Sequence, residues 1–434
     1  MTHKAKPSRT LTTEELARVE GEGAMRVEIH EGTVGRVELN IYEPPRFFEG
    51  FLRGRRYSEP PDITARICGI CPVAYQMSAC RAIEDALGLE VNGQLRELRR
   101  LLYCAEWIES HILHIHFLHL PDFFGLDSAI DLAGINRPAV ERALALKKIG
   151  NELLELIGGR AIHPINVQVG GFYKVPTRRE LLAFRPKLEH ARDMAAEVVE
   201  LVGGLDFPEL EVDHEMVALR HPTEYAILDG RIISDGGLDI TDQEYPEHFV
   251  EEHVEHSTAL HSRIRARGTY LVGPLARFRL NFDRLTTVAA DAAGAVGLTA
   301  DCSNPFRSIV VRAVETLDVI EVGLAIVDAY DEPDRPYLEA TIGGGTGHGA
   351  TEAPRGLLYH RYKLSDDGVI TDAVITPPTS QNQAAIEDDL TRYVQANIGL
   401  DDEELRKGAE VTIRNHDPCI SCATHFLDLT VVRT

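Results

Sequence analysis

Apolar and polar residues alternate in the segment GAMRVEIHEGTVGRVELNIYEPP, which covers residues 23–45. Alternation with a period of two is typical of a β-strand that has one covered face. The run EGTVG at 31–35 interrupts the alternation with residues that favour a turn. The pattern therefore predicts a β-hairpin near the start of the chain.

Other segments repeat their apolar residues with the spacing of a helix. The longest follows Asn92, a suitable N-cap, and runs from Gln94 without Gly or Pro as far as Pro121. A shorter one follows Cys71 and stops at Gly88, so Cys71 lies in a loop that leads into a helix. More amphipathic segments lie at about 138–157, 178–204, 306–331 and 384–398. We therefore expect an α+β fold that is predominantly helical.

The stretch between about 205 and 245 has a different character, because it is rich in Gly and Pro and contains short β-like runs. Within it, Asp229 and Gly230 form a pair typical of a tight hairpin turn. We expect a small β element here. The glycine-rich run at 342–349 lacks the G-x-G-x-x-G spacing and precedes no clear helix, so we expect no nucleotide-binding fold. Length alone would allow two or three domains, or one large α-rich domain.

The composition narrows the classes of partner. The chain has 45 Lys and Arg against 68 Asp and Glu, a formal net charge of −23, which disfavours nucleic acid as a partner. No apolar run reaches the roughly 18 residues of a membrane span, and the start of the chain has no apolar signal core. Seven cysteines argue against a disulfide framework and fit a reducing compartment. We expect a cytoplasmic protein with no direct membrane insertion.

Four of the cysteines form two C-x-x-C pairs at opposite ends of the chain, Cys68 with Cys71 and Cys419 with Cys422. Four thiolates suit nickel, zinc or an iron-sulfur cluster. Structural zinc sites keep both pairs close together in sequence, and these pairs are far apart. On spacing alone, zinc still ranks first among the metals.

The residues around the two pairs change that ranking. The pairs lie in R-x-C-G-x-C at 66–71 and D-P-C-x-x-C-x-x-H at 417–425. Four further segments follow the same order along the chain: RVEGEG at 18–23, GRAIHPINVQVGG at 159–171, EAPRGLL at 352–358 and TPPTSQN at 376–382. Together they resemble the large subunit of nickel-iron hydrogenases over nearly the whole chain. The resemblance implies that family's fold, with a central bundle of long helices.

The resemblance also implies a role for each cysteine. Cys68 and Cys419 would be terminal ligands of nickel, while Cys71 and Cys422 would bridge nickel to an iron that carries cyanide and carbon monoxide. Thiolates stabilise low-charge nickel and let it change redox state, and a bridging sulfur holds two metals close together. Zinc offers no redox chemistry.

Further site residues follow from the same resemblance. Cys419 would take the proton when hydrogen is split and Glu20 would receive it, with Glu22 the weaker candidate. Arg355 would lie over the metals and donate hydrogen bonds to cyanide. The segment with Pro377, Pro378 and Thr379 would hold the second cyanide. Asp122 and Asp417 match acidic positions around the pocket and are candidates to pair with Arg355.

A second ion is implied beside the nickel-iron centre. Its ligands would be Glu49, the backbone carbonyl of Ile375 and His425, and a hard carboxylate suits magnesium, although iron also fits a Glu and His site. In the family an endopeptidase cuts after this histidine once nickel is loaded. Residues 426–434 would then be a maturation peptide that is removed, and residues 1–425 would form a single domain.

The remaining histidines and cysteines have simpler interpretations. His111 and His114 are expected to line the pocket or a hydrogen-bond network, and we expect packed or solvated side chains at His116, His119, His253 and His256. Cys80, Cys104 and Cys302 are expected to be small core residues. Many relatives have a histidine where this chain has Tyr75, whose hydroxyl is a possible substitute donor to a bridging thiolate.

The function implied is reversible cleavage of hydrogen into protons and electrons. Cys80, Cys104 and Cys302 lack the spacing of a cluster, so the electrons need an iron-sulfur small subunit. CPVAYQ and RVEGEG look most like the cytoplasmic branch with NAD(P)-linked flavin diaphorase subunits, which includes the sulfhydrogenases. Maturation would need the endopeptidase and nickel-insertion factors. The alternatives are a metal-free, quinone-binding subunit like that of respiratory complex I, which has lost the four cysteines, and an unrelated zinc-stabilised interaction protein.

Overall fold

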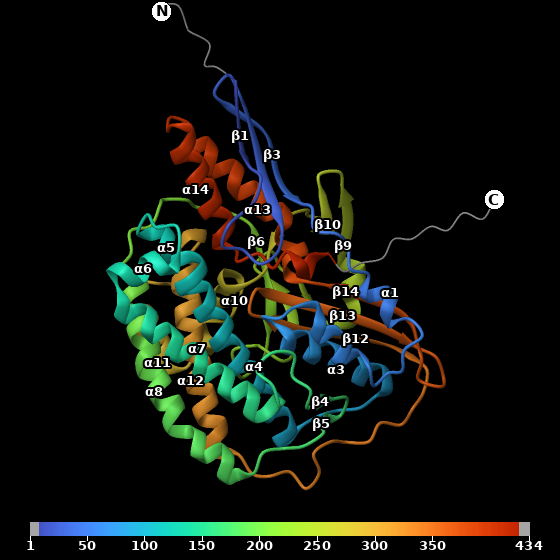
Figure 1. The fold of residues 1–434 in the computed structure, drawn as a ribbon. Helices are drawn as coiled ribbons and strands as arrows, with labels where there is room; N and C mark the ends of the chain where they lie inside the picture. Colours follow the sequence, from blue (N-terminus) through green and yellow to red (C-terminus); the bar gives the residue numbers. More distant parts are fainter. Residues whose placement is uncertain (1–7, 425–434) are drawn as a thin grey trace, which may run out of the picture.

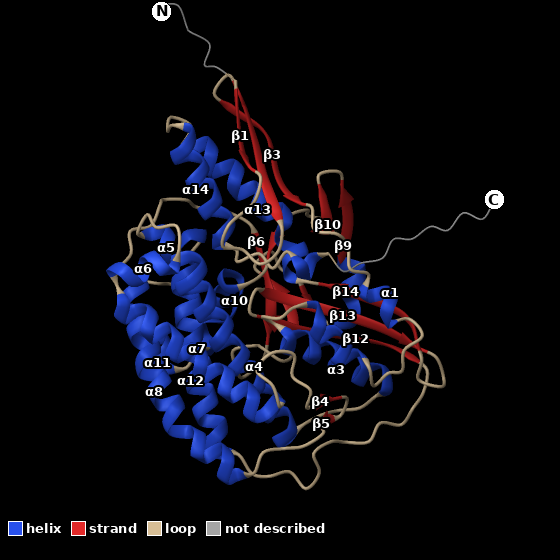
Figure 2. Cartoon of the chain, viewed as in Figure 1, coloured by secondary structure: helices blue, strands red, loops and turns tan. Residues whose placement is uncertain are grey.

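The computed structural model describes residues 8–424 of the chain. Helices gather on one side of the molecule and most strands on the other (Figures 1 and 2). The first strands and the last two helices lie side by side, so the two ends of the described chain meet (Figure 1). None of the helices within 8–424 is long and apolar enough to cross a bilayer.

Long helices build the first side. They are α4 (Gly93–Leu113), α7 (Arg137–Gly158), α8 (Arg178–Gly203) and α12 (Ser308–Ala329). Helix α12 is apolar on nearly all faces and is buried along most of its length, so it forms the centre of the bundle. The prediction of a mainly helical fold with a central bundle of long helices is confirmed.

The helix predicted to run to Pro121 is not regular throughout. Helix α4 ends at Leu113, a π-helical segment covers His114–His119, and α5 (Leu120–Phe123) continues beyond Pro121. A proline has no amide hydrogen and its ring crowds the preceding turn of a regular helix, and a wider π turn relieves that contact. At the other end Asn92 occupies the N-cap position in an extended conformation, but its side chain makes no capping hydrogen bond.

The predicted amino-terminal hairpin is confirmed and belongs to a larger sheet. Strands β2 (Gly23–His30) and β3 (Thr33–Ile41) pair antiparallel, and β1 (Arg9–Thr13), which the sequence reading missed, adds to β2. The turn is formed by Glu31 and Gly32, whose φ angles are both positive. Two such residues give a turn whose twist matches that of the strands.

The β element expected between about 205 and 245 is present, but its hairpin lies elsewhere. Strand β6 (Glu215–Arg220) pairs with β7 (Arg231–Ser234), so residues 221–230 form a long connection rather than a tight turn at Asp229 and Gly230. Strands β8 (Asp239–Ile240) and β11 (Tyr270–Leu271) complete the sheet. The side chains of Tyr225, Ala226 and Ile227 are buried in this connection, which explains the β-like apolar pattern.

The glycine-rich run at 342–349 forms part of a strand that the sequence reading did not anticipate. Strand β12 (Gly345–Ala353) pairs with β13 (Gly356–Leu364), which pairs with β14 (Ile370–Thr376). Helix α3 (Pro72–Leu87) packs directly on β12. A Cβ atom on Gly347 would lie 2.0 Å from the carbonyl oxygen of Ala82 on α3, so glycine is needed for this close approach.

The remaining elements complete the described chain. Strands β9 (Phe249–Val254) and β10 (Ser257–Ile264) form a hairpin. Helix α13 (Pro378–Ala396) starts earlier than the predicted 384 because Pro378 suits the first helical turn, and α14 (Asp402–Asn415) follows it. The short elements are α1 (Phe48–Leu52), α2 (Pro60–Thr64), α6 (Ala129–Ile135), α9 (Tyr245–His248), α10 (Pro274–Asn281), α11 (Thr287–Ala295), β4 (Val167–Gln168) and β5 (Gly171–Phe172).

A buried ion-pair network joins the helical side to the sheet side. Arg277 on α10 contacts Glu315 of α12 at 3.0 Å and Glu352 of β12 at 3.2 Å, and all three side chains are fully buried. The guanidinium also lies over the ring of Trp107 on α4, 4.2 Å from its centre. Removing one member would leave an uncompensated buried charge, so the network fixes the relative position of the two sides.

The buried His116 gives a test of this packing. Burial lowers the pKa of His116 to about 4. The unfolded chain therefore binds a proton below about pH 6.5 that the folded chain does not bind, and acidification destabilises the fold. The variant His116→Leu has no ionisable side chain at this position, so its unfolded state does not take up this proton. Between pH 6.5 and pH 4, wild type should lose about 3 kcal/mol relative to the variant, measured by urea unfolding across this range. A difference independent of pH would contradict the assignment of a neutral buried ring.

Candidate metal centre

The two distant C-x-x-C pairs meet in the folded chain. Cys68 follows a short 3-10 turn, Cys71 is the N-cap of α3, and Cys419 and Cys422 lie at the turn after α14. The Sγ atoms of Cys68 and Cys419 are 3.4 Å apart, and those of Cys71 and Cys422 are 3.8 Å apart. All four thiols are buried and reduced, and their sulfur atoms lie within 4.8 Å of one another. Such a set can hold a metal ion.

The loops that carry the cysteines are tied together by backbone contacts. The amide of Ile420 donates to the carbonyl oxygen of Glu20 at 2.8 Å, which pairs the segment before β2 with the second cysteine loop. The guanidinium of Arg46 donates to the carbonyl oxygens of Ile67, at 2.7 Å, and of Ser421. Arg46 therefore spans both cysteine loops. The sequence reading missed it, because a lone arginine after two prolines has no distinguishing pattern.

Helix α3 is held at its first turn by a second residue that sequence reasoning missed. The carboxylate of Glu106 on α4 accepts from the amides of Val73, at 2.6 Å, and Ala74, at 3.0 Å. These amides belong to the first turn of α3, next to Cys71, where helix amides lack partners within the helix. Burial raises the pKa of Glu106 well above its usual value. Glu106 faces α3 from a different helix, so only the tertiary structure reveals its contact.

Glu20 and Cys419 lie in direct contact, as the resemblance predicted. The Cys419 thiol donates to Glu20 Oε2 at 3.1 Å, and the amide of Ser421 donates to the same oxygen at 3.1 Å. Burial raises the pKa of the Glu20 carboxyl. Glu22 is exposed. A proton can therefore pass between the Cys419 sulfur and Glu20 without an intermediate group.

Arg355 and Asp417 form a buried pair at the cysteine cluster. Arg355 Nε donates to the carbonyl oxygen of Asp417 at 2.8 Å, and Nη2 donates to its Oδ1 at 3.1 Å. Within 8–424, Nη1 of Arg355 has no hydrogen-bond partner. The pKa of Arg355 is raised well above its usual value despite burial, because the Asp417 carboxylate and the cysteine sulfurs favour its charge. A buried cation with a spare donor suits an anionic ligand beside the thiols.

Asp122 does not pair with Arg355. Its carboxylate accepts from Arg414 Nε at 2.8 Å and from Arg18. The expected pairing is thus confirmed for Asp417 and wrong for Asp122, because α5 places Asp122 between these two arginines. Arg18 directly precedes the segment with Glu20, so Asp122 supports the backbone near the cluster.

The segment with Pro377, Pro378 and Thr379 opens α13 at the cluster. Pro377 is the N-cap of the helix and Pro378 its first residue. The Thr379 hydroxyl oxygen accepts from the amide of Cys419 at 2.9 Å. The hydroxyl group of Thr379 can still donate its hydrogen to another acceptor.

Glu49 and Ile375 also come together, since Glu49 Oε1 accepts from the amide of Ile375 at 2.8 Å. Glu251, which the sequence reading did not single out, lies near them and accepts from Thr376 Oγ1 at 3.0 Å. Burial, reinforced by the Glu49 charge, raises the pKa of Glu251 to about 8. A buried carboxylate beside a half-buried one suits a hard divalent cation. His425, the third expected ligand, lies outside the described residues.

The outcome for the other histidines is mixed. His114 Nε2 lies 2.9 Å from the carbonyl oxygen of Arg414, and His111 Nε2 lies 3.2 Å from Glu315, so both take part in polar contacts as expected. His116 and His119 are buried, in agreement with the packed interpretation. His256 instead contacts a carboxylate on α13.

Tyr75, Cys80 and Cys104 are all fully buried. The Tyr75 hydroxyl lies beside the Cys422 thiol, and burial together with the charge of that cysteine raises the pKa of Tyr75 well above its usual value. Burial raises the pKa of Cys80 and of Cys104 to about 12, which fits inert core thiols. Cys302 is half-buried.

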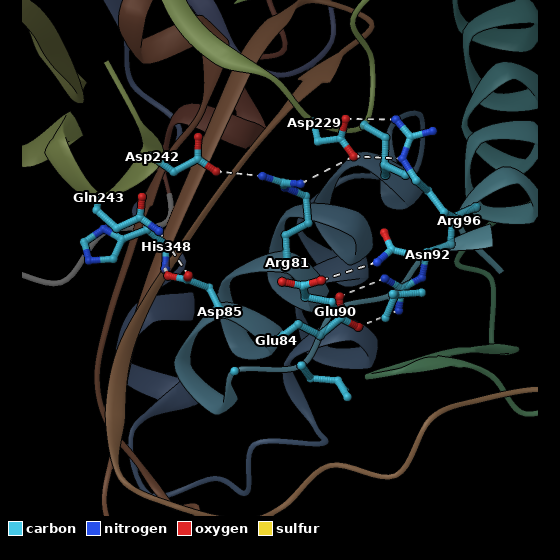
Figure 3. A pocket seen from close by; sticks show the side chains of 15 residues that line it. Arg81, Glu84, Asp85, Glu90, Asn92, Arg96, Asp229, Asp242, Gln243 and His348 are labelled. Carbon is cyan, nitrogen blue, oxygen red and sulfur yellow. Dashed lines mark hydrogen bonds and ion pairs between the residues drawn. The ribbon is translucent and has the colours of Figure 1, made fainter. Parts of the chain in front are cut away.

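A polar hollow of about 350 Å³ at the far end of α3 is a separate feature (Figure 3). Its three arginines all pair with carboxylates: Arg81 with Asp242, Arg96 with Asp229 and Arg99 with Glu84. With its positive charges neutralised, the hollow is not an anion site.

Comparison with known proteins identifies the cysteine cluster. A family model described as nickel-dependent hydrogenase matches residues 46–136 and 311–425. Sulfhydrogenase 1 subunit alpha of Pyrococcus furiosus is 34% identical over 427 residues, 96% of this chain and 98% of the relative. The chain belongs to the nickel-dependent hydrogenase family. It is the catalytic large subunit of a nickel-iron hydrogenase, and the metal-free and zinc-protein alternatives are not supported.

Two further matches extend over nearly the whole hydrogenase chain. The beta subunit of the NAD-reducing hydrogenase HoxS of Cupriavidus necator is 28% identical and covers 97% of this chain and 95% of its own. The crystal structure of an NAD⁺-reducing [NiFe]-hydrogenase in the H₂-reduced state has a TM-score of 0.86 and 29% identity, covering 96% of this chain and 99% of that one. The predicted family and fold are therefore confirmed.

The contact between Glu106 and α3 leads to a prediction. Glu106→Ala leaves two buried amides of α3 without an acceptor, which costs roughly 1–3 kcal/mol for each. Because the first turn of α3 positions Cys71, nickel bound per chain should fall together with stability, as measured by metal analysis and urea unfolding. Glu109→Ala is the matched control, since Glu109 is buried on the same helix but pairs with Lys147. Equal nickel content in Glu106→Ala and wild type would contradict a positioning role.

Proposed function

We propose that this large subunit oxidises hydrogen at a nickel-iron centre held by all four cysteines of the cluster, and also catalyses the reverse reaction. Cys68 and Cys419 act as terminal ligands of nickel, while Cys71 and Cys422 bridge to iron. The observation that carries the proposal is the convergence of four buried thiols, from two motifs at opposite ends of the chain, within 4.8 Å. Soft thiolates in that number suit nickel and iron.

The surroundings of the thiols fit cyanide and carbon monoxide on the iron. Arg355 offers a buried Nη1 without a hydrogen-bond partner in the described chain, and cyanide is an acceptor that suits it. Thr379 is a second donor at the start of α13, with Pro377 and Pro378 fixing the backbone around it. When bound, the nickel-iron centre supplies a redox-active Lewis acid that takes up the electrons of hydrogen.

Residues of the protein bind and transfer the proton that is released when hydrogen is cleaved. Cys419 holds the proton on its Sγ atom and passes it to Glu20 Oε2, which is 3.1 Å away. Burial raises the pKa of Glu20, which makes its carboxylate a better acceptor for a proton from Cys419. Asp417 holds Arg355 in place through two hydrogen bonds, and Asp122 fixes Arg18 and Arg414 behind the cluster.

We further propose a magnesium ion beside the centre, bound by Glu49, the carbonyl oxygen of Ile375 and His425. Glu251 supports this assignment, since a second, half-buried carboxylate lies near Glu49 and a dication would balance both charges. We propose that a maturation endopeptidase removes residues 426–434 after nickel-insertion factors have loaded the site, which leaves residues 1–425 as a single domain.

Electrons must leave the centre through another subunit. In the described chain Cys80, Cys104 and Cys302 lie outside the one cysteine cluster, so the large subunit has no iron-sulfur path of its own. We propose an iron-sulfur small subunit as the direct partner and flavin-containing, NAD(P)-linked diaphorase subunits beyond it, in a cytoplasmic complex. The likeness to NAD-reducing hydrogenases supports this assembly.

Replacing Glu20 tests the proposed function. Glu20→Gln removes the proton acceptor while keeping the size of the side chain, so hydrogen oxidation by the complex with an artificial electron acceptor should fall at least ~100-fold. Nickel content should stay at the wild-type level. Glu22→Gln is the control, because Glu22 is exposed and should leave the rate unchanged. Full activity of Glu20→Gln in nickel-loaded complex would rule out this proton path.

A further inference from the structure

Two histidines and a glutamate gather at a site away from the four cysteines. His256 lies in the turn between β9 and β10, His261 lies on β10, and Glu387 lies on α13. One ligand atom from each residue lies within 4.8 Å of the other two. His256 Nε2 and Glu387 Oε1 are 2.7 Å apart, and the two imidazole rings are 5.6 Å apart. One hairpin and one helix thus bring three potential metal ligands together.

His261 is the member whose environment calls for a ligand. Its side chain is 1% exposed, and its Nε2 atom has no hydrogen-bond partner among residues 8–424. Leaving a buried ring nitrogen unsatisfied is unfavourable by roughly 1–3 kcal/mol. Burial lowers the pKa of His261 to about 4, so the ring is neutral at physiological pH. The neutral imidazole is the form that binds metal ions.

The charges around the cluster favour a cation. Glu387 Oε1 accepts from the amide of Leu39 at 2.9 Å, which fixes the carboxylate at the cluster. Glu38, next to Leu39 on β3, is also buried but pairs with Arg36, so Glu387 is the carboxylate that faces the histidines. The nearby Arg263 pairs with Glu252 at 3.2 Å, so its positive charge is compensated. A dication between the histidines and Glu387 would balance the negative charge.

We propose that His256, His261 and Glu387 bind a zinc ion at this site. Two imidazoles and one carboxylate are a ligand set that zinc adopts in proteins, with water as the fourth ligand. The side chains of His256 and Glu387 are 18% and 17% exposed, which leaves a route for the ion and its water. The ion replaces the direct contact between His256 and Glu387 and gives the orphaned nitrogen of His261 its partner.

The zinc site fastens a hairpin that supports the catalytic cysteines. Ala259 lies two residues before His261 on β10 and packs with Ile420, which lies between Cys419 and Cys422. On the other side, α13 carries both Glu387 and Thr379, the residue whose hydroxyl binds the amide of Cys419. A zinc ion bonded to β10 and to α13 therefore holds together two elements that contact the second cysteine loop.

A second group of similar composition lacks the same properties. His221, Glu224 and Asp229 also have ligand atoms within 4.8 Å of one another. However, Arg96 donates to both carboxylates, at 2.6 Å to Glu224 and at 2.9 Å to Asp229, beside the hollow in Figure 3. The Arg96 guanidinium already pairs with both carboxylates, and its positive charge repels a cation. This group serves as a control for the first.

Metal analysis of the purified hydrogenase complex, prepared without chelators, tests the proposal. Wild type should contain about one zinc per large subunit in addition to its nickel. His261→Gln should lose that zinc and keep its nickel. The controls His253→Gln, an exposed position on the same hairpin, and His221→Gln, in the second group, should keep the zinc.

Cobalt gives a readout that needs no variant. After zinc is exchanged for Co²⁺, wild type should contain about one cobalt ion per large subunit by metal analysis, and removal of the ion with a mild chelator should lower the unfolding temperature. Zinc-free wild type that binds no cobalt after Co²⁺ addition would overturn the proposal, as would zinc that persists in His261→Gln. Wild-type complex that contains zinc but no nickel would instead count against the nickel-iron centre, so the two failures are distinguishable.

Discussion

The closure of two cysteine pairs from opposite ends of the chain into one buried cluster is the constraint on which the structure depends. Thiols that must become thiolates are unfavourable in a dry interior unless positive charge and hydrogen-bond donors surround them. The cluster has the Arg355 guanidinium for charge and the amides of Ile70 and Cys71, which donate to Cys68 Sγ, for hydrogen bonds. A metal supplies the rest of the compensation.

The fold can be understood as a support for the two cysteine loops. Helix α3 carries the first loop and is fixed between β12, where glycines allow close packing, and α4, whose Glu106 holds its first turn. The second loop lies between the end of α14 and the amino-terminal sheet, and it pairs with the backbone at Glu20. The buried ion pairs of Arg277 hold α10 against α12 and β12, where the helical side meets the sheet side. Such rigidity keeps donors and ligands in place before the metals arrive.

The sequence revealed the parts of the molecule that have a period or a specific motif. The bundle helices and the hairpin of β2 and β3 follow from apolar spacing, and the motifs located Cys68, Cys419, Glu20, Arg355 and Thr379 at one site. Contacts between distant segments left no such signal. Glu106 and Arg46 form hydrogen bonds with backbone groups of other elements. The glycines of β12 are needed because helix α3 packs closely on this strand. The sheet of β12, β13 and β14 was missed because most of its residues are buried on both faces, which removes the alternation that marks a strand.

Nickel K-edge X-ray absorption on the intact, nickel-loaded complex tests the central claim most directly, because it counts the atoms bound to nickel. The account predicts four sulfur neighbours, one from each cysteine of the cluster. Each of the four single Cys→Ser variants should either bind no nickel or show one sulfur fewer. A nickel shell made mainly of nitrogen and oxygen atoms, or full nickel binding with an unchanged sulfur shell in any of these variants, would contradict it.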